Sequence, residues 1–156
     1  MLTEQAFQEA AERYLDMVYR IALNWFRNSA DAEDAAQNTM LRLWQTDTAF
    51  QGEDHLRHWL VRVTLNECKR IAFHPWRSRT VPLENCPEVA FTDPVKAELF
   101  QEVMALPAKY RVPLYLYYYE GYSVDEVGEL LKLKPSTVQT RLARARAKLK
   151  TQLKEG

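Results

Sequence analysis

Glycine is scarce in this chain, whose 156 residues contain four glycines against seven prolines. The tight turns of β-hairpins favour glycine because they need positive φ angles, so this scarcity argues against a β-sandwich or a β-barrel. Long segments consist instead of Ala, Leu, Glu, Gln, Lys and Arg, which have high helix propensity. The composition therefore predicts an all-α fold.

Cysteine and long apolar runs are also lacking. Cys68 and Cys86 are the two cysteines and they form no C-x-x-C motif, which excludes a disulfide framework and a zinc ribbon. No stretch of about 18 apolar residues occurs, and Glu4, Glu9 and Glu12 stand where a signal peptide would be basic. We therefore expect a cytoplasmic protein without membrane insertion.

The net charge of zero conceals two unlike ends. Residues 1–47 contain four basic and eight acidic side chains, a net charge of −4, whereas residues 132–156 contain eight basic side chains against Glu155, a net charge of +7. The acidic end repels phosphate and the basic end attracts it. This asymmetry indicates a nucleic-acid contact at the carboxyl end and a different partner at the amino end.

The first part of the chain is predicted to form three amphipathic helices. Apolar residues recur at helical spacing over 7–25, and a second helix follows a break at Asn28, with Ser29 or Asp31 as its cap. A polar loop over 46–54 leads to a third helix over 56–73. The residues expected to face inward are Phe7, Ala11, Tyr14, Leu15, Val18, Ile21, Ala22, Trp25, Ala36, Met40, Leu43, Trp44, Trp59, Leu60, Val63, Ile71 and Phe73.

Four prolines between 75 and 94 indicate a linker between two domains. Beyond it we expect helices over 95–105 and 108–119. Ser123 and Glu126 then form an S-x-x-E capping box, a short turn follows over 132–134, and Pro135 stands in the first turn of a last helix. The predicted organisation is a helical domain over 1–75, a Pro-rich linker over 76–92 and a second helical domain over 93–156.

The short capped helix, tight turn and basic helix over 121–149 follow the pattern of a helix-turn-helix. On the last helix, Val138, Leu142, Ala145 and Leu149 fall on one predicted buried stripe. Cations occupy both flanks: Arg141, Arg144 and Lys148 on one, and Arg146 and Lys150, with Gln139, on the other. The small residues Ser136, Thr140, Ala143 and Ala147 lie between them. Such a helix suits the major groove, since its flanks can hold both phosphate walls.

Two further segments carry polar patterns in the first domain. Asp31, Glu33, Asp34, Gln37, Asn38 and Arg42 share one side of the second helix, which taken alone favours a solvated face rather than an acid–base site. Residues 50–79 mix cations, amides and aromatics, as proteins that bind single-stranded nucleic acid do. A metal site of His55, His58, Cys68 and His74 is disfavoured, because His55-x-x-His58 is the only tight ligand pair among them, and Cys68 is expected to be a buried apolar residue.

These segments, in this order, resemble the extracytoplasmic function (ECF) class of bacterial RNA polymerase sigma factors. Residues 31–44 (DAEDAAQNTMLRLW) and 50–66 (FQGEDHLRHWLVRVTLN) are similar to sigma region 2. Leu106-Pro107, Tyr110-Arg111, residues 121–123 and 136–146 are similar to region 4, and the match spans nearly the whole chain. Arg70, Leu56 and Ser136 depart from residues common in the family, which often has an acidic residue where Arg70 stands.

The resemblance implies a promoter-specificity subunit that directs core RNA polymerase to promoters and helps to melt them, with no catalytic site, metal or cofactor. Polymerase is expected to be met at its clamp coiled coil and its flap, and docking on the clamp is assigned to Asp31, Glu33, Asp34, Gln37, Asn38 and Arg42. Minus-ten DNA binding is assigned to Gln51, Gly52, Glu53, Asp54, His55, Arg57, Arg62, Asn66, Lys69 and Arg70, with the 51–55 loop receiving a flipped base. Double-stranded minus-thirty-five DNA is assigned to Ser136, Thr137, Gln139, Thr140, Arg141, Arg144, Arg146 and Lys148. An anti-sigma partner is expected for the family.

An alternative interpretation is an autonomous helix-turn-helix regulator whose first domain senses a ligand or dimerises. Such a regulator would bind its DNA without polymerase, and it would have no need of an acidic docking face. An enzyme is disfavoured because the sequence contains no phosphate-binding Gly-rich loop, no H-E-x-x-H motif and no candidate triad.

Overall fold

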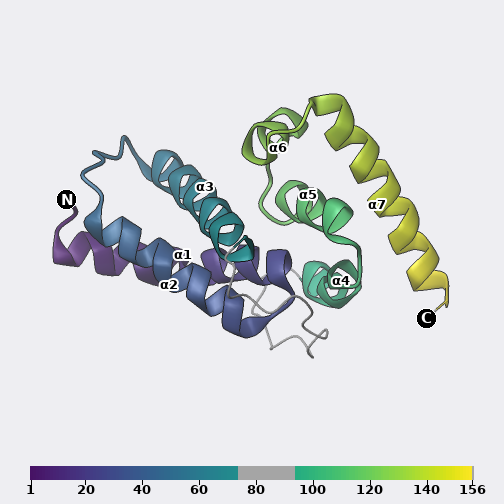
Figure 1. Ribbon diagram of the computed structural model, residues 1–156, viewed down its shortest axis with the longest axis horizontal. Coiled ribbons are helices and arrows are strands. Elements are labelled where there is room, and N and C mark those ends of the chain that lie inside the picture. The colour runs from purple at the N-terminus through teal and green to yellow at the C-terminus, as the bar shows by residue number, and fades with distance from the viewer. Residues whose placement is uncertain (74–93, 156) are drawn as a thin grey trace. The chain divides into compact units, whose positions relative to one another are not determined.

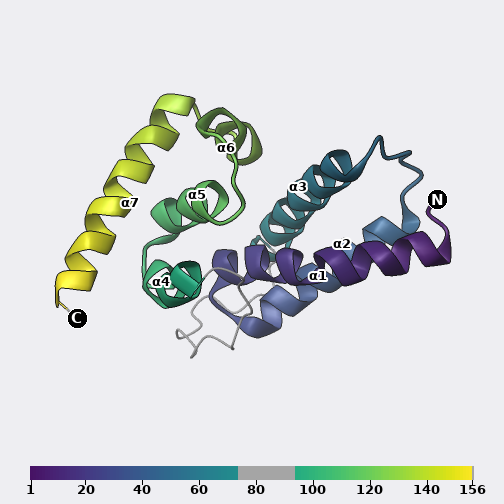
Figure 2. The ribbon, with the colours of Figure 1, turned by 180° about the vertical axis from the view of Figure 1, so that it is seen from behind.

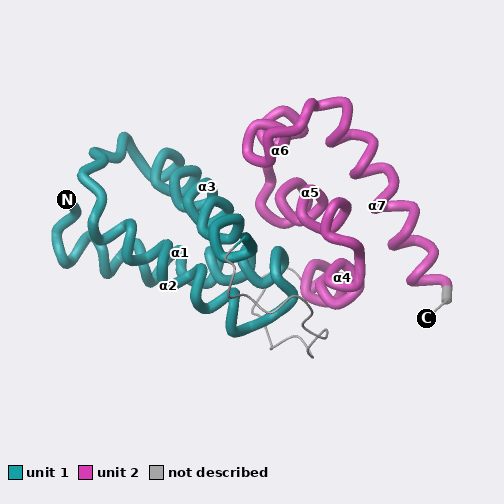
Figure 3. Tube along the Cα trace, in the orientation of Figure 1, with its two compact units in different colours: residues 1–87 teal, residues 88–156 magenta. Residues whose placement is uncertain are grey.

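The computed structural model describes residues 1–73 and 94–155 (Figure 1), and every regular element in those ranges is a helix. The chain divides into two compact units, 1–87 and 88–156 (Figure 3). The all-α prediction is confirmed. All of the linker expected over 76–92, Cys86 included, lies outside the described residues, as does His74.

The described part of unit 1, residues 1–73, contains three packed helices: α1 (Glu4–Phe26), α2 (Ser29–Gln45) and α3 (Glu53–Ala72), each in contact with the other two (Figures 1 and 2). Thr3 caps α1 through its side chain, and Arg27 ends it in the left-handed conformation at φ 59°. The core contains Val18 and Leu43, both with no exposed surface.

The start of α2 differs from its prediction. The side-chain oxygen of Asn28 accepts the hydrogen bond of the Asp31 amide at 3.1 Å, so Asn28 is the N-cap in place of Ser29 or Asp31. All three residues have short polar side chains that can cap. The extended backbone of Asn28, directly after left-handed Arg27, decides which of them does so.

On each helix, the residues in the middle of the predicted inward face are buried, whereas some of those at its margins are not. Leu15, Trp44 and Phe73 are exposed, with Phe73 at 84 %. Trp44 instead lies edge-on to the ring of Phe7, with the centroids 5.1 Å apart. On α3 the buried stripe is Leu56, Leu60, Val61, Thr64, Leu65, Glu67 and Cys68. Met40, Trp59, Val63, Ile71 and Leu149 are half-buried, because the stripe on each helix is narrower than its apolar pattern.

Unit 2 contains α4 (Pro94–Met104), α5 (Ala108–Tyr118), α6 (Val124–Leu131) and α7 (Pro135–Glu155). The helix α7 contacts each of the other three. Tyr115 is buried at the centre of the unit. Its ring stacks on Tyr119 at 4.9 Å and meets the edge of Phe100 at 6.4 Å. This core fixes the position of α7, whose outer face carries the candidate DNA contacts.

Candidate nucleic-acid interface

A tight turn sets α7 against α6. The predicted capping box forms at the start of α6: the Ser123 hydroxyl accepts from the Glu126 amide, and the Glu126 carboxylate accepts from the Ser123 amide. Lys132 ends α6 in the left-handed conformation at φ 58°. The Leu133 amide donates to the Gly128 carbonyl at 2.8 Å, which brings the turn against the helix. The local geometry is that of a helix-turn-helix.

One stripe of α7 faces the core and the remainder faces solvent. Val138, Leu142 and Ala145 are at most 2 % exposed, as their spacing predicts. The residues between the cationic flanks, Ser136, Thr140, Ala143 and Ala147, are exposed. The buried stripe therefore holds the helix while its small-residue side remains open to a ligand.

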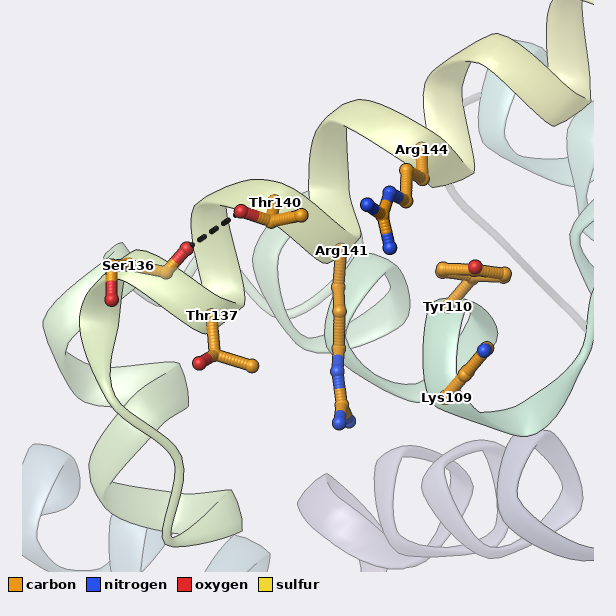
Figure 4. Close-up of a pocket in the computed structure, with 7 residues that line it drawn as sticks. All are labelled: Lys109, Tyr110, Ser136, Thr137, Thr140, Arg141 and Arg144. Atoms are coloured by element: carbon orange, nitrogen blue, oxygen red, sulfur yellow. Dashed lines mark hydrogen bonds between the residues drawn. The ribbon is translucent and has the colours of Figure 1, made fainter.

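A shallow cavity of about 330 Å³ lies where the start of α7 meets the start of α5 (Figure 4). Hydroxyl and cationic side chains line it: Lys109, Tyr110, Ser136, Thr137, Thr140, Arg141 and Arg144. Five of these are sequence-predicted site residues. Lys109 and Tyr110 are not among the predicted site residues, because nothing in the linear pattern shows that the start of α5 lies beside α7.

Cations surround the ring of Tyr110. The Nζ atoms of Lys109 and Lys148 lie 5.0 and 5.6 Å from its centroid, and Arg144 lies beside it. Burial opposes ionisation of the phenol, but hydrogen bonding and charge from Lys109 and Arg144 outweigh it and place the pKa of Tyr110 below its ordinary value. A positive potential of this kind attracts an anion such as a DNA phosphate.

The opposite flank of α7 has its own aromatic contact. The guanidinium of Arg146 lies 5.7 Å from the ring centroid of Tyr117. Arg146 and Lys148, both predicted to bind DNA, therefore lie over different ends of α5. Gln139, also exposed, is on the flank of Arg146.

The acidic side of α2 is presented to solvent. Glu33, Asp34 and Gln37 are exposed, and Asp31 and Asn38 are half-buried. Arg42, predicted with them, differs because its Nε donates to Oε1 of Glu67 on α3. Five of the six predicted polymerase contacts thus form one surface, while the sixth also joins α2 to α3.

The loop between α2 and α3 is held by hydrogen bonds and ring contacts. The Gln51 amide donates to Nδ1 of His55 at 2.9 Å, and the Gln51 side chain donates to the Ala49 carbonyl at 3.2 Å. Phe50 meets His55 and Trp59 edge-on, with centroids 5.3 and 5.5 Å apart. These contacts fix the conformation of the loop where it enters α3, at Gly52, whose φ is 143°.

A second cavity, of about 320 Å³, lies between this loop and α1. Apolar side chains and three charged ones line it: Leu2, Ala6, Glu9, Ala10, Arg13, Phe50, Gly52, Glu53 and Leu56. Arg13 pairs with Glu53 at 2.6 Å, and the Tyr14 hydroxyl donates to the same carboxylate at 2.6 Å. Hydrogen bonds from Arg13 and Tyr14 hold the pKa of Glu53 below its ordinary value. The contribution of α1 to this site was not predicted.

The remaining predicted minus-ten residues lie along α3. Asp54, Arg62, Asn66 and Arg70 are exposed, and Arg57 and Lys69 are half-buried. Arg70 donates from Nε to Oε2 of Glu67 at 2.7 Å. Arg62, Asn66 and Arg70 are four residues apart and so share one face of the helix.

Cys68 is fully buried, as expected, and burial together with the charge of Glu67 raises the pKa of its thiol. Within residues 1–73 and 94–155, no three His, Cys, Asp or Glu side chains gather where they could hold a metal ion. In the same ranges, no helix has the length and apolarity to cross a bilayer.

Comparison with known proteins identifies both units. Residues 10–77 match sigma-70 region 2, and residues 96–149 match sigma-70 region 4. The chain is 32 % identical to the ECF RNA polymerase sigma factor SigM of Mycobacterium tuberculosis, over 92 % of this chain and 75 % of that protein. It is 27 % identical to the ECF sigma factor SigW of Bacillus subtilis, over 97 % and 91 %.

Solved structures share the fold. The sigma factor RpoE of Bartonella quintana, crystallised with the anti-sigma factor NepR, matches with a TM-score of 0.64 at 21 % identity, covering 95 % of this chain and 96 % of that one. CnrH, in complex with the cytosolic domain of CnrY, matches with a TM-score of 0.64 at 23 % identity, over 98 % and 90 %.

Proposed function

Because this chain belongs to the ECF class of RNA polymerase sigma factors and so directs RNA polymerase to promoters, we propose that its two units divide that task. Unit 1 docks on polymerase and opens the minus-ten DNA, and unit 2 reads the minus-thirty-five duplex. The observation that carries this division is the charge of the two exposed faces: α2 presents carboxylates, and α7 presents cations around small residues.

Unit 2 places α7 in the major groove in this proposal. Gln139, Thr140 and Arg141, near the start of the helix, reach base edges, because side chains of these types can pair with bases. Lys109, Tyr110 and Arg144 hold a backbone phosphate in the cavity between α5 and α7. Phosphate contacts fix the position of the helix, and the base contacts give it specificity.

Unit 1 docks on the polymerase clamp through Asp31, Glu33, Asp34, Gln37 and Asn38. Support comes from the exposure of Glu33, Asp34 and Gln37, since an acidic face of this size does not serve DNA binding. In this proposal polymerase is the partner of this face, and DNA is the partner of α3 and α7.

The cavity beside the 46–52 loop receives the flipped minus-ten base. Phe50 supplies an aromatic wall, and Arg13 and Glu53 supply hydrogen-bonding groups. Extruding a base costs a few kcal/mol. Contacts of Arg57, Arg62, Asn66 and Lys69 with the separated strand offset that cost, because cations and amides along one helix suit a strand backbone.

Other partners follow the family. An anti-sigma factor restrains this protein, as the complexes of the structurally similar RpoE and CnrH suggest, and unit 2 also meets the polymerase flap. The protein acts in the cytoplasm as a non-enzymatic initiation factor without metal or cofactor.

The test is capture of purified core RNA polymerase by the wild-type protein and by Asp34→Arg and Gln37→Ala. Polymerase should bind the wild type, with at least tenfold weaker binding by Asp34→Arg, because the charge at the docking face is reversed. Asp16→Arg is the matched control, since Asp16 is an exposed carboxylate on α1, outside the docking face. If the folded wild-type protein does not bind polymerase but selects specific DNA in its absence, the protein is an autonomous regulator instead.

A further inference from the structure

Glu67 on α3 is a buried carboxylate with two cationic partners. Its side chain is 3 % exposed and lies where α3 packs against α2, and both of these helices bear proposed binding surfaces. Its Oε1 accepts from Nε of Arg42 on α2, and its Oε2 accepts from Nε of Arg70, three residues later on α3, at 2.7 Å. Each oxygen of one carboxylate is thus taken by a different arginine.

The charges of this group do not cancel. One carboxylate faces two guanidiniums, so a positive charge remains at the surface. Burial favours the protonated form of Glu67, but the hydrogen bonds and charges of Arg42 and Arg70 outweigh it and hold the pKa of Glu67 below its ordinary value. At neutral pH the carboxylate is therefore ionised and orders both arginines.

The choice of Nε decides which atoms of the arginines face outward. A guanidinium is a planar fork with five N–H donors, and Nε is the one nearest the chain. Because Nε of Arg70 is bonded to Glu67 and the side chain is 52 % exposed, the end of the guanidinium formed by its two terminal nitrogens remains available to a second partner. The same holds for Arg42, whose side chain is 56 % exposed. Two terminal nitrogens in one plane suit bidentate contact with a phosphate or a carboxylate.

We propose that Glu67 is a positioning residue: it orients the guanidinium of Arg70 toward a phosphate of the melted minus-ten strand and ties that site to the polymerase-docking helix through Arg42. This inference rests on the proposed function. Neither Glu67 nor this coupling follows from the family resemblance, which favours an acidic residue where this chain has Arg70. The consequence is that Glu67, which cannot touch DNA, controls a DNA contact.

The test uses reconstituted holoenzyme and the DNA that wild-type holoenzyme selects from a random library of duplexes with single-stranded overhangs. Binding is measured against salt concentration for wild type, Glu67→Gln, Arg70→Ala and the double variant. We expect Glu67→Gln and Arg70→Ala each to bind about fivefold more weakly and to lower the salt slope by about 0.7, the value for one single-strand phosphate. The double variant should lose no more than Arg70→Ala, because both changes remove the same contact.

Thr64→Val is the matched control. Thr64 is fully buried on the same helix and its hydroxyl donates to the Leu60 carbonyl at 2.6 Å, so its loss perturbs the core without reaching either arginine. A purely structural role for Glu67 predicts that Glu67→Gln keeps the wild-type salt slope, as Thr64→Val does. That result would overturn the inference.

Arg70→Lys keeps the test decisive if Glu67→Gln does not form holoenzyme. Lysine keeps the positive charge but lacks the planar fork, so it cannot give one edge of its charged group to Glu67 and another to a phosphate. We expect Arg70→Lys to lower the salt slope of DNA binding by the same amount as Arg70→Ala. Wild-type binding by Arg70→Lys would overturn the inference. If wild-type protein fails to assemble with polymerase, the proposed function itself is wrong.

Discussion

Tyr110 and Glu67 show how a single buried side chain can organise charged neighbours. Lys109, Arg144 and Lys148 gather around the aromatic ring of Tyr110. Glu67 is anionic, and it orders Arg42 and Arg70. In each case the central residue is hidden and the cations remain at the surface. Charged residues counted along the sequence do not reveal which of them are held in this way.

The Glu67 cluster makes the stability of unit 1 depend on pH. Because the folded state holds the pKa of Glu67 below its ordinary value, near 4.3 for glutamate, ionised Glu67 stabilises the fold at neutral pH. That stabilisation is lost as pH falls from this value through the folded pKa. We expect Glu67→Gln to melt below the wild type at pH 7 and the two melting temperatures to converge toward pH 3. Circular dichroism at a series of pH values measures this, and a constant difference would contradict it.

At the scale of the element, the turn between α6 and α7 depends on the close approach of Gly128 to the backbone of Leu133. A Cβ built on Gly128 would lie 2.6 Å from the Leu133 carbonyl oxygen and 3.6 Å from a methyl carbon of Val138. Glycine is therefore required inside a helix, where it is usually unfavourable. The spacing between α6 and α7 depends on this missing side chain.

Gly128→Ala should therefore destabilise unit 2. Overpacking of this kind costs about 1–3 kcal/mol, and the clash is with backbone, which cannot rotate away. The melting temperature should fall by several degrees in thermal unfolding, despite the higher helix propensity of alanine. Glu129→Ala, an exposed change at the next position of α6, is the control and should leave it nearly unchanged. Equal melting of Gly128→Ala and wild type would exclude the close approach.

The elements were more predictable than the contacts between them. Periodicity and capping residues located the helices, because these signals lie within a few residues of one another. Trp44 and Phe73 were placed inside by their apolarity, but which side chains are covered depends on how helices pack. The cavity formed by α5 and α7 and the pairing of Arg42 with Glu67 join residues that are at least 25 positions apart in the chain. Local patterns carry no information on such pairings.

At the scale of the whole molecule, the zero net charge conceals two faces of opposite charge. The acidic face belongs to α2 in unit 1, and the basic face belongs to α7 in unit 2. A polymerase-bound sigma factor needs both, because one surface must avoid DNA while the other attracts it. Variants in the two units should therefore fail in different assays.

Arg144→Ala should weaken promoter binding by holoenzyme and lower the magnitude of its salt slope by about 1, the effect of one lost phosphate contact. Capture of core polymerase should stay at the wild-type level, because Arg144 lies on α7. Asp34→Arg should instead lose capture of core polymerase. Lys154→Ala removes the same charge at the far end of α7 and is the control. Loss of polymerase capture by Arg144→Ala would contradict the division of labour.

The arrangement of α7 separates the residues that fold the helix from those proposed to read DNA. Val138, Leu142 and Ala145 are buried, whereas Ser136, Thr140, Ala143 and Ala147 are exposed and small. Substitutions on the exposed side leave the core packing unchanged, so they change stability little. A duplicated copy of the gene can therefore diverge toward new promoters through a few outward substitutions while its fold is conserved.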